Sequence, residues 1–422
     1  MRLMMISLDA CFQRDAQTLL ALPNLGALAA EGVFCDNVRT IYPTLTYPIH
    51  TSIITGCYPD RHGVGHNEKY APDDAPGLRP WYWDEADIQV PTLFSAAYQA
   101  GREVATLLWP VTGHSRGIKY NFPEALAMPW ENQVLKVLKY GSAWWLLKNE
   151  IKFGKQRVSN KQPYLDRYAT LLTEQLIYRQ YADESPEFEE KDVKPSRRRM
   201  GQNMPDMLAL HLVDCDAMRH EYGVSSPEAE ASLVRLDQLV GRVLQALEYR
   251  KAREDTIVAV VSDHGQDDVT ESVDLNALFR QNQVPCQAHT LGFGAYIRCE
   301  RAEVARVYQY LSDHMDEYSL SHVYSRQELR ELHAPEDVLL AVEAQPGVEI
   351  LESGDMQPHR ANHGFGLHHP GARTLLWLSG PMFKKNARLT QASVVDIAPT
   401  LAEAAGLYFP PCQGRVLRET FR

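Results

Sequence analysis

Acidic and histidine side chains follow three apolar runs of the sequence, at the points where these runs end. They are Asp9 after Leu3–Leu8, Asp214 and Asp216 after Met207–Val213, and Asp263-His264 after Thr256–Ser262. In an open sheet of parallel strands, ligands bind at the carboxyl ends of the strands. Carboxylate oxygens and imidazole nitrogens together are ligands for zinc, manganese or iron. One acidic residue after a strand is commonly a turn or a helix cap, but three such positions favour a metal site.

Two further segments add histidines to this set. Asp216 and His220 are four positions apart, which places both side chains on one face of a helix, although ordinary surface pairs share this spacing. His363-Gly364-Phe365 lies in a stretch that also contains His359, His368 and His369. We expect one ligand in this stretch and three bystanders.

The segment from Tyr42 to Gly56 (YPTLTYPIHTSIITG) contains a candidate nucleophile. Its pattern predicts a helix that begins near Thr46 and ends at Gly56. Thr46 then either caps this helix or lies at its positive N-terminus, where a phosphate is favoured. A free threonine hydroxyl is a poor nucleophile at neutral pH, and a metal ion that lowers its pKa makes it a good one.

These segments resemble the motifs of the nucleotide pyrophosphatase/phosphodiesterase family of the alkaline phosphatase superfamily. The motifs present are Ser7-Leu8-Asp9, Pro43 to His50 (PTLTYPIH), Thr55 to Gly63 (TGCYPDRHG), Trp109-Pro110, Asp216 to Gly223 (DAMRHEYG), Ser262 to Gly265 (SDHG) and His363 to Phe365 (HGF). Each motif is weak alone, but their number and order argue against a chance match. The resemblance extends from residue 7 to about residue 406.

The resemblance assigns roles to particular residues of this chain. Thr46 resembles the nucleophile that forms a covalent phospho-threonine. The ligands of one metal ion would be Asp9, Thr46, Asp263 and His264, and those of the other Asp216, His220 and His363. Asn67, 21 residues beyond Thr46, stands where the family has an asparagine that hydrogen-bonds a phosphoryl oxygen. Tyr47 stands where an aromatic ring flanks the substrate.

The cofactors implied by this site are two divalent metal ions. Mixed Asp and His ligand sets suit zinc, which we favour, and they also admit manganese or iron. In the resembling family the two ions activate the threonine and bind the oxygens of the phosphate during an in-line displacement.

The sequence departs from the family's pattern in three places. Arg219 precedes His220 where the family usually has glycine, and we interpret it as an outward-facing loop residue, with the binding of substrate charge as the alternative. Gly366-Leu367 follows the last motif where Asp-Asn is common. The aromatic residues that hold nucleotides and the extracellular disulfides of the family cannot be placed. These differences leave the expected ligands intact but weaken the case for nucleotide substrates.

The expected function is metal-dependent hydrolysis of phosphate esters, with phosphodiester or pyrophosphate bonds favoured. A phosphomonoesterase, or a phosphonoacetate-hydrolase-like enzyme that cleaves a carbon–phosphorus bond, would use the same site. A third alternative is a metal- or phosphate-binding protein without catalytic activity. A sulfatase is disfavoured, because the superfamily's sulfatases use a cysteine-derived nucleophile where this chain has Thr46.

Short apolar runs alternate with amphipathic stretches, which is typical of an α/β fold. The expected strands are Leu3–Leu8, Val104–Trp109, Met207–Val213, Thr256–Ser262 and Thr374–Leu378, and the expected helices are Leu19–Glu31, Pro91–Gly101, Pro227–Tyr249 and Val394–Gly406. With the resemblance, this pattern predicts an alkaline-phosphatase-like three-layer sandwich. Its central, largely parallel sheet would have helices on both faces and carry an inserted cap.

The predicted ligands come from both ends of the sequence, so we expect one discontinuous catalytic core. It comprises residues 1–114, 204–275 and 358–422. Residues 115–203 are predicted to form an inserted helical cap, which contains the Trp144-Trp145 pair, interpreted as packing, an acidic run at 183–192 and a basic run at 194–199. Residues 276–357 form a smaller predicted insertion, with a possible strand pair in Ala288–Ile297.

Composition and charge limit the partners of this chain of 422 residues. Its formal net charge of −11 argues against a broad nucleic-acid or anionic membrane surface. No apolar stretch approaches the roughly 18 residues of a membrane span. The seven cysteines are widely spread and lack a CxxC pattern, so neither a disulfide framework nor a thiolate zinc site is indicated. We therefore expect a cytoplasmic protein with a small phosphorylated substrate, and the sequence leaves its oligomeric state open.

Overall fold

The computed structural model describes residues 1–71, 74, 78–178 and 204–422, and a large sheet lies at its centre. Along its main path the strand order is β16 (Ala387–Arg388), β2 (Val33–Arg39), β15 (Arg373–Ser379), β6 (Thr256–Val261), β1 (Arg2–Leu8), β5 (Met207–Leu212), β3 (Val104–Leu107) and β4 (Tyr120–Phe122). The short strand β17 (Ala392–Ser393) also pairs with β2. Strands β6, β1, β5, β3 and β4 are mutually parallel, whereas β15 is antiparallel to both of its neighbours.

The central strands are apolar throughout because both faces of the sheet are covered. Along β1, Met4, Ile6 and Leu8 pack into one hydrophobic cluster, while Leu3 and Met5 pack into another on the opposite face. The alternation of side chains along a strand therefore divides the core into two layers.

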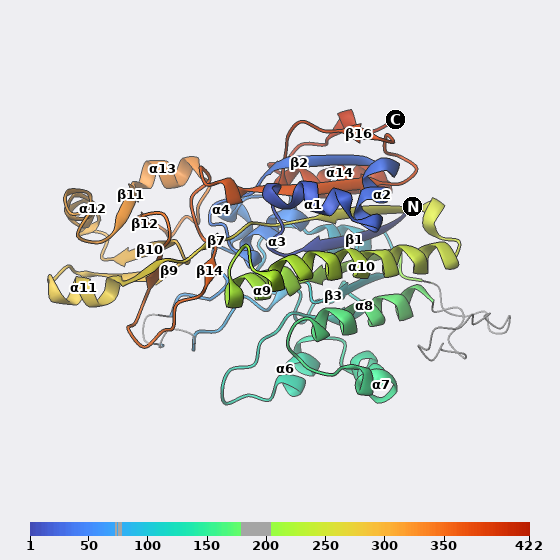
Figure 1. Cartoon of the computed structure of the whole chain (residues 1–422), viewed down its shortest axis with the longest axis horizontal. Helices are drawn as coiled ribbons and strands as arrows, with labels where there is room; N and C mark the ends of the chain where they lie inside the picture. Colours follow the sequence, from blue (N-terminus) through green and yellow to red (C-terminus); the bar gives the residue numbers. More distant parts are fainter. Residues whose placement is uncertain (72–73, 75–77, 179–203) are drawn as a thin grey trace.

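Helices cover both faces, which confirms the predicted three-layer sandwich (Figure 1). The first face is covered by α1 (Ala16–Ala21), α2 (Pro23–Glu31), α8 (Tyr164–Ile177) and α10 (Pro227–Tyr249). The second face is covered by α3 (Thr46–Thr55), α5 (Leu93–Gln99) and α14 (Ile397–Ala405). The fold class expected from the sequence is thus correct.

The predicted elements agree with the observed ones except near one proline. Helix α10 has the predicted bounds, and all five predicted strands are present with ends shifted by no more than two residues. The single helix predicted at Leu19–Glu31 is instead divided into α1 and α2. Pro23 begins α2, and Leu22 before it is extended, with ψ of 149°. A proline clashes with a helical residue before it, so the helix ends there and restarts.

Residues 276–357 build a smaller four-stranded sheet with its own hydrophobic core, at the left of Figure 1. Its strands are β11 (Leu320–Tyr324), β12 (Ala341–Ala344), β10 (Gly294–Cys299) and β9 (Cys286–Thr290), and its helices are α11 (Leu275–Gln281), α12 (Val304–Asp313) and α13 (Arg326–Glu331). Strands β9 and β10 pair antiparallel, which confirms the strand pair expected there. The strands β8 (Glu271–Asp274) and β13 (Val348–Leu351) pair where this segment leaves and rejoins the rest.

Part of the segment assigned to the cap belongs to the main body of the protein. Strand β4 is an edge strand of the central sheet, and α8 packs on α10 and on the sheet. Helices α6 (Gln133–Tyr140) and α7 (Ala143–Phe153) lie farther out, beyond α8, at the lower edge of Figure 1. The acidic and basic runs at 183–192 and 194–199 lie outside the described residues. The division into a core and two insertions stays a prediction.

Among the described residues, no helix combines the length and the apolar composition that a membrane crossing requires.

Gly56 ends helix α3 in the left-handed conformation, at φ 64°, and its environment is tight. A Cβ there would lie 2.8 Å from Cys412 Sγ and 3.1 Å from Val395 O. Gly101 has a similar φ of 73°, but a Cβ at that position would have no other atom within 4 Å.

We expect Gly101→Ala to lower the free energy of unfolding by about 1 kcal/mol through backbone strain alone. Gly56→Ala should cost at least about 1 kcal/mol more, because the C-terminal segment must also move. Urea unfolding of the two variants measures both losses, and equal losses would contradict the tight packing at Gly56.

Candidate active site

Three loops that carry the predicted ligands meet at one edge of the central sheet. Asp9 directly follows β1, and Asp263 and His264 follow β6. Helix α9 (Asp214–Tyr222), which carries Asp216 and His220, begins after β5. Strand β1 lies between β5 and β6 and is parallel to both, so their carboxyl ends are adjacent. The expected position of the site at the ends of parallel strands is therefore what the structure has.

The first group of ligand atoms converges on His264. Its Nε2 lies 3.2 Å from Thr46 Oγ1, 3.3 Å from Asp263 Oδ2 and 3.7 Å from Asp9 Oδ1. Ligand atoms of a tetrahedral zinc site, each about 2 Å from the ion, are about 3.3 Å apart. The four side chains thus have the spacing of a metal coordination sphere.

In each carboxylate of this group the protein holds one oxygen and leaves the other without a partner. Ala10 N–H donates to Asp263 Oδ1 at 3.1 Å, and His211 Nε2 lies 2.8 Å from Asp9 Oδ2. The remaining oxygens, Asp9 Oδ1 and Asp263 Oδ2, are buried and have no hydrogen-bond partner. An unpaired buried carboxylate is costly, and a cation bound between these two oxygens would remove that cost.

The second group consists of Asp216, His220 and His363, whose ligand atoms all lie within 4.8 Å of one another. His220 Nδ1 donates to Ala361 O at 2.8 Å, and His363 Nδ1 donates to Thr44 O at 3.1 Å. A carbonyl on Nδ1 fixes the tautomer in which Nε2 is free to bind a metal. His220 Nε2 lies 3.3 Å from Asp216 Oδ1, so it points into the group.

The electrostatics of the two groups differ. Burial, together with the charge of Asp263, raises the pKa of Asp9 well above its usual value. Burial alone would also raise the pKa of Asp216, but the neighbouring His220, His363 and His264 lower it overall. The rings of His264 and His363 lie 4.1 Å apart, so the two groups are neighbours. Together they fit two adjacent cations.

Thr46 is the first residue of α3 and does not cap it. The capping position is Leu45, and no side chain makes a cap hydrogen bond. The Thr46 hydroxyl faces His264 instead, and the side chain is 8% exposed. Of the two roles left open by the sequence, the structure therefore excludes the cap and retains a hydroxyl beside the ligands at a helix N-terminus.

Asn67 and Tyr47 occupy different environments. Asn67 Oδ1 accepts a 2.9 Å hydrogen bond from Tyr47 N–H, which places the amide next to Thr46. The Tyr47 side chain is completely buried and packs on Trp81 at 5.1 Å between ring centroids. The ring therefore packs within the protein beside the start of α3, and its expected contact with a substrate stays a prediction.

Comparison with known proteins decides the family of this chain. The family model for type I phosphodiesterase/nucleotide pyrophosphatase matches residues 3–368. The chain belongs to this family. Its members are hydrolases of the alkaline phosphatase superfamily, so this chain is an enzyme of the phosphodiesterase type.

Several relatives resemble the chain over most of its length. Bis(5'-adenosyl)-triphosphatase ENPP4 of Pongo abelii is 22% identical over 422 residues, which cover 98% of this chain and 80% of the relative. Human ectonucleotide pyrophosphatase/phosphodiesterase family member 1 is 26% identical over 260 residues, 58% of this chain and 21% of that protein. The solved structure of murine ectonucleotide pyrophosphatase/phosphodiesterase 5 matches all of both chains with a TM-score of 0.72 at 17% identity. This likeness confirms the alkaline-phosphatase-like fold.

Sequence reasoning missed three side chains that support the phosphodiesterase site. His50 lies one turn after Thr46 and donates from Nδ1 to Thr46 O at 2.9 Å, while its Nε2 accepts from Ser7 at 2.8 Å. His211 lies within β5 and contacts Asp9. Glu124 Oε2 lies 3.7 Å from His211 Nδ1. His50 belongs to the PTLTYPIH motif, so the sequence could have indicated it as a site residue. His211 and Glu124 belong to no motif, and only the fold brings them to the site.

The interpretation of Arg219 as an outward-facing residue is wrong. Its side chain is 2% exposed, and Nη2 pairs with Asp15 Oδ1 at 2.6 Å. It also donates to the carbonyl of Ala10, next to Asp9, and lies over the Phe12 ring. One side of α9 faces solvent and the other is buried. Arg219 lies on the buried side, where its charge is paired with Asp15. Arg219 thus connects the two ligand-bearing segments.

The second departure, Gly366, also has a structural reason. Gly366 N–H donates to Glu343 Oε1 at 2.8 Å, and a Cβ at this position would overlap the side chains of Glu343 and Tyr324. These two side chains bond each other through the Tyr324 hydroxyl. The smaller sheet therefore occupies the space that a longer side chain at residue 366 would need.

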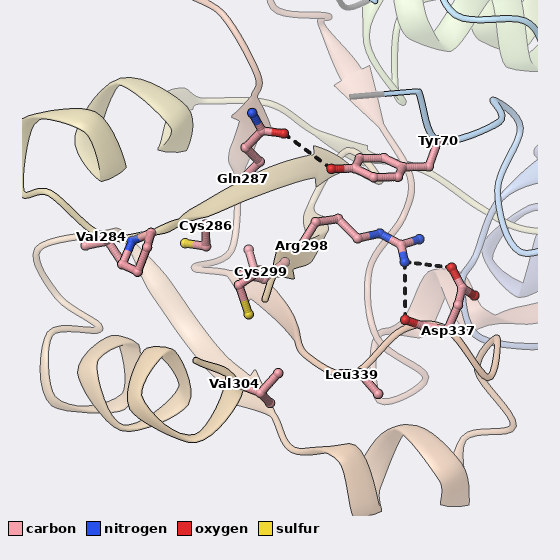
Figure 2. A pocket seen from close by; sticks show the side chains of 11 residues that line it. Tyr70, Val284, Cys286, Gln287, Arg298, Cys299, Val304, Asp337 and Leu339 are labelled. Atoms are coloured by element: carbon pink, nitrogen blue, oxygen red, sulfur yellow. Dashed lines mark hydrogen bonds and ion pairs between the residues drawn. The ribbon is translucent and has the colours of Figure 1, made fainter. Parts of the chain in front are cut away.

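A hollow of about 530 Å³ on the smaller sheet contains none of the predicted site residues (Figure 2). Arg298 lies in it, but its Nη1 donates to Asp337 Oδ2 at 2.6 Å, and the Tyr70 hydroxyl donates to Gln287. The guanidinium is thus already paired with a carboxylate, which disfavours this hollow as a phosphate site.

Two buried carboxyl groups should contribute stability to the metal-free protein that is lost as the pH rises, while buried histidines with lowered pKa values, such as His50 and His363, act in the opposite direction. Burial, with the charges of Asp216 and Asp263, raises the pKa of Glu124 to about 8, and the pKa of Asp9 is raised as well. The folded protein therefore keeps protons that the unfolded chain releases near pH 4.5. Between about pH 5 and pH 8 this should cost on the order of 3 kcal/mol.

Thermal unfolding across this pH range, with and without zinc, measures the effect. Bound cations favour the ionised carboxylates, so zinc should flatten the pH dependence. Comparison with metal-free Glu124→Gln isolates the carboxyl contribution, because the histidines are the same in both proteins: the variant should become more stable relative to the parent as the pH rises from about 5 to 8. The same slope with and without zinc would contradict a cation site here.

Removing the Arg219 guanidinium should leave Asp15 buried without its partner. We expect Arg219→Met to lower the free energy of unfolding by about 3–5 kcal/mol. The double variant Arg219→Met/Asp15→Leu should recover most of this loss, because no unpaired charge remains. Chemical unfolding of both variants provides the measurement, and a loss below about 0.5 kcal/mol for Arg219→Met would mean that the residue behaves as a surface residue.

Proposed function

We propose that this enzyme hydrolyses phosphodiester or pyrophosphate bonds through Thr46, with two divalent metal ions, of which zinc is favoured. The observation that carries the proposal is the convergence of Thr46 Oγ1, Asp9 Oδ1 and Asp263 Oδ2 on His264 Nε2. A hydroxyl in such a ligand set is placed for attack, whereas a hydroxyl that merely caps a helix bonds backbone N–H groups. Asp9, Thr46, Asp263 and His264 would hold one ion, and Asp216, His220 and His363 the other.

When bound, the ions would lower the pKa of the threonine hydroxyl and offset the charge of the phosphate oxygens. Thr46 Oγ then forms a bond to phosphorus as the bond from phosphorus to the leaving oxygen breaks, and that oxygen takes up a proton. Water subsequently attacks the phospho-threonine from the opposite side, and the Thr46 hydroxyl is restored with a proton. No redox change occurs, and each step exchanges one P–O bond for another.

Other side chains of the site would orient these steps. Thr46 lies at the N-terminus of α3, where the positive end of the helix dipole favours an anion such as the phosphate. Asn67 Oδ1 is held by Tyr47 N–H, which leaves its amide N–H groups as donors for a phosphoryl oxygen. His50 holds the carbonyl of Thr46, and because burial lowers its pKa it stays neutral and does not repel the cations.

Related proteins support this proposal. One relative is named a bis(5'-adenosyl)-triphosphatase, which is a pyrophosphate-cleaving activity. A solved structure of murine ectonucleotide pyrophosphatase/phosphodiesterase 5 holds AMP in a variant made inactive by a threonine-to-alanine substitution. It matches this chain with a TM-score of 0.73 at 17% identity. The predicted cytoplasmic location remains a proposal, with all seven cysteines free as its support.

We expect Thr46→Ala to lower kcat for bis(p-nitrophenyl) phosphate by at least about 1,000-fold, because no attacking oxygen remains. Thr46→Ser should retain part of the activity. Thr51→Val is the matched control, since the Thr51 hydroxyl only bonds the carbonyl of Tyr47 in the same helix.

Zinc binding by calorimetry should persist in Thr46→Ala, because six other ligands remain. Faster turnover of p-nitrophenyl phosphate or of phosphonoacetate than of the diester would favour the monoesterase or the carbon–phosphorus hydrolase. Full activity of Thr46→Ala would overturn the assignment of the nucleophile.

A further inference from the structure

Helices α6 and α7 expose large apolar side chains. Trp144 and Ile151 are 69% and 79% exposed, and Leu147 between them is also exposed. The spacing of three and four residues places them on one face of α7, while Leu146 and Phe153 on the other side are buried. On and near α6, Trp130 and Leu135 are exposed as well. Trp144 thus lies on the surface, contrary to the packing role expected from the sequence. An apolar surface of this kind marks a binding face.

The same segment is basic in an otherwise acidic protein. Residues 126–161 contain seven lysines and arginines and two glutamates, a net charge of +5, whereas the whole chain carries −11. Both glutamates pair within the segment, Glu131 with Lys136 and Glu150 with Arg157. The exposed basic residues are Lys139, Lys148, Lys152, Lys155 and Lys161. Tryptophan and leucine on one face with lysines beside them are typical of helices that lie on an anionic lipid surface.

A cavity of about 550 Å³ lies behind this segment, between α6, α7, α8 and α9. Its lining is largely apolar and includes Phe122, Val137, Leu138, Leu146, Leu165 and Met218. Leu126 and Val134 line the cavity and are also among the exposed apolar residues of the segment. The cavity therefore adjoins the exposed apolar face, and its volume is that of a ligand site.

The inner wall of the cavity adjoins the proposed metal ligands. Ala217 and Met218 line it from α9, the helix that carries Asp216 and His220. Glu124 lines it too, 3.7 Å from His211 Nδ1, and His211 Nε2 lies 2.8 Å from Asp9 Oδ2. An apolar chain in this cavity could therefore place its polar end on the side of the proposed ligands.

We propose that α6 and α7 bind an anionic lipid surface, and that the cavity receives the apolar chain of an amphiphilic phosphodiester drawn from that surface. The part of this inference that concerns the substrate rests on the proposed function. Charge complementarity alone would also admit an acidic protein, such as a second copy of this chain. The exposed tryptophans favour the lipid surface, because their rings suit the interface between headgroups and acyl chains. A local basic face would thus bind the anionic surface that the whole-chain charge disfavours.

The first test measures surface binding without catalysis. Zinc-loaded Thr46→Ala protein is sedimented with vesicles of phosphatidylglycerol and phosphatidylcholine, and with vesicles of phosphatidylcholine alone. We expect binding to the anionic vesicles that weakens with salt and falls at least about tenfold in Trp144→Ser/Ile151→Glu. Tyr408→Ser is the matched control, because Tyr408 is 81% exposed outside this segment.

The second test measures whether the cavity binds an apolar chain, again in the Thr46→Ala variant. Dodecyl phosphate, below its micelle concentration, should bind at least about tenfold more tightly than methyl phosphate in calorimetry. Val137→Trp, which fills the cavity away from the proposed ligands, should remove this difference and leave methyl phosphate binding unchanged.

The outcomes separate this inference from the proposed function. Absence of vesicle binding, or equal affinity for the two phosphates, would overturn it even if diester hydrolysis through Thr46 is confirmed. If Trp144→Ser/Ile151→Glu converts a dimer into a monomer and vesicles do not bind, the face joins two copies of this chain, and the inference is likewise wrong. Vesicle binding and chain-length preference would support it even if Thr46→Ala proved active.

Discussion

The repulsion between two buried carboxylates is the constraint on which the rest of this structure depends. Asp9 and Asp263 lie at the ends of adjacent central strands, and each presents one buried oxygen without a hydrogen-bond partner. A low-dielectric interior makes such a pair expensive when both groups are ionised, which raises the pKa of Asp9, and the surrounding fold must hold the two groups together until a cation compensates their charge. The sheet meets this requirement, because β1 and β6 are paired along their length and cannot separate at one end.

The layers around the sheet hold the remaining groups against this centre. Helix α3 packs its apolar face on the sheet and so fixes Thr46 at its first residue. Helix α9 follows β5 and carries two of the proposed metal ligands, and Arg219 connects this helix to the loop after Asp9. Histidines that bond backbone carbonyls through Nδ1 set the direction of their Nε2 atoms. These two histidines are therefore oriented by hydrogen bonds to backbone carbonyls, whose positions change little when nearby side chains move.

Much of this arrangement could be predicted because it depends on local patterns. The apolar runs before Asp9 and Asp263, and the four-residue spacing of Asp216 and His220, indicated strands and a helix that the structure has. The split at Pro23 follows from a local rule for prolines that the predicted single helix did not take into account, whereas the burial of Arg219 and the contribution of His211 could not be obtained from local patterns. Both depend on what a distant segment places opposite the residue: the carboxylate of Asp15 for Arg219, and the oxygen of Asp9 for His211. The burial of the Tyr47 ring beside Trp81 likewise depends on a segment distant in the sequence.

Helix α9 has a consequence for how such an enzyme can diverge. One side of this two-turn helix carries Asp216 and His220, and Ala217, Met218 and Glu221 on the same helix line the apolar cavity. A substitution on the α9 wall that reshapes the cavity would also displace the ligands, so selection for activity should preserve that wall. The opposite wall of the cavity is formed by α6 and α7, and neither of these helices carries a proposed metal ligand. Under the proposal that this cavity receives part of the substrate, changes in α6 and α7 would alter substrate preference and leave the proposed metal ligands on α9 in place.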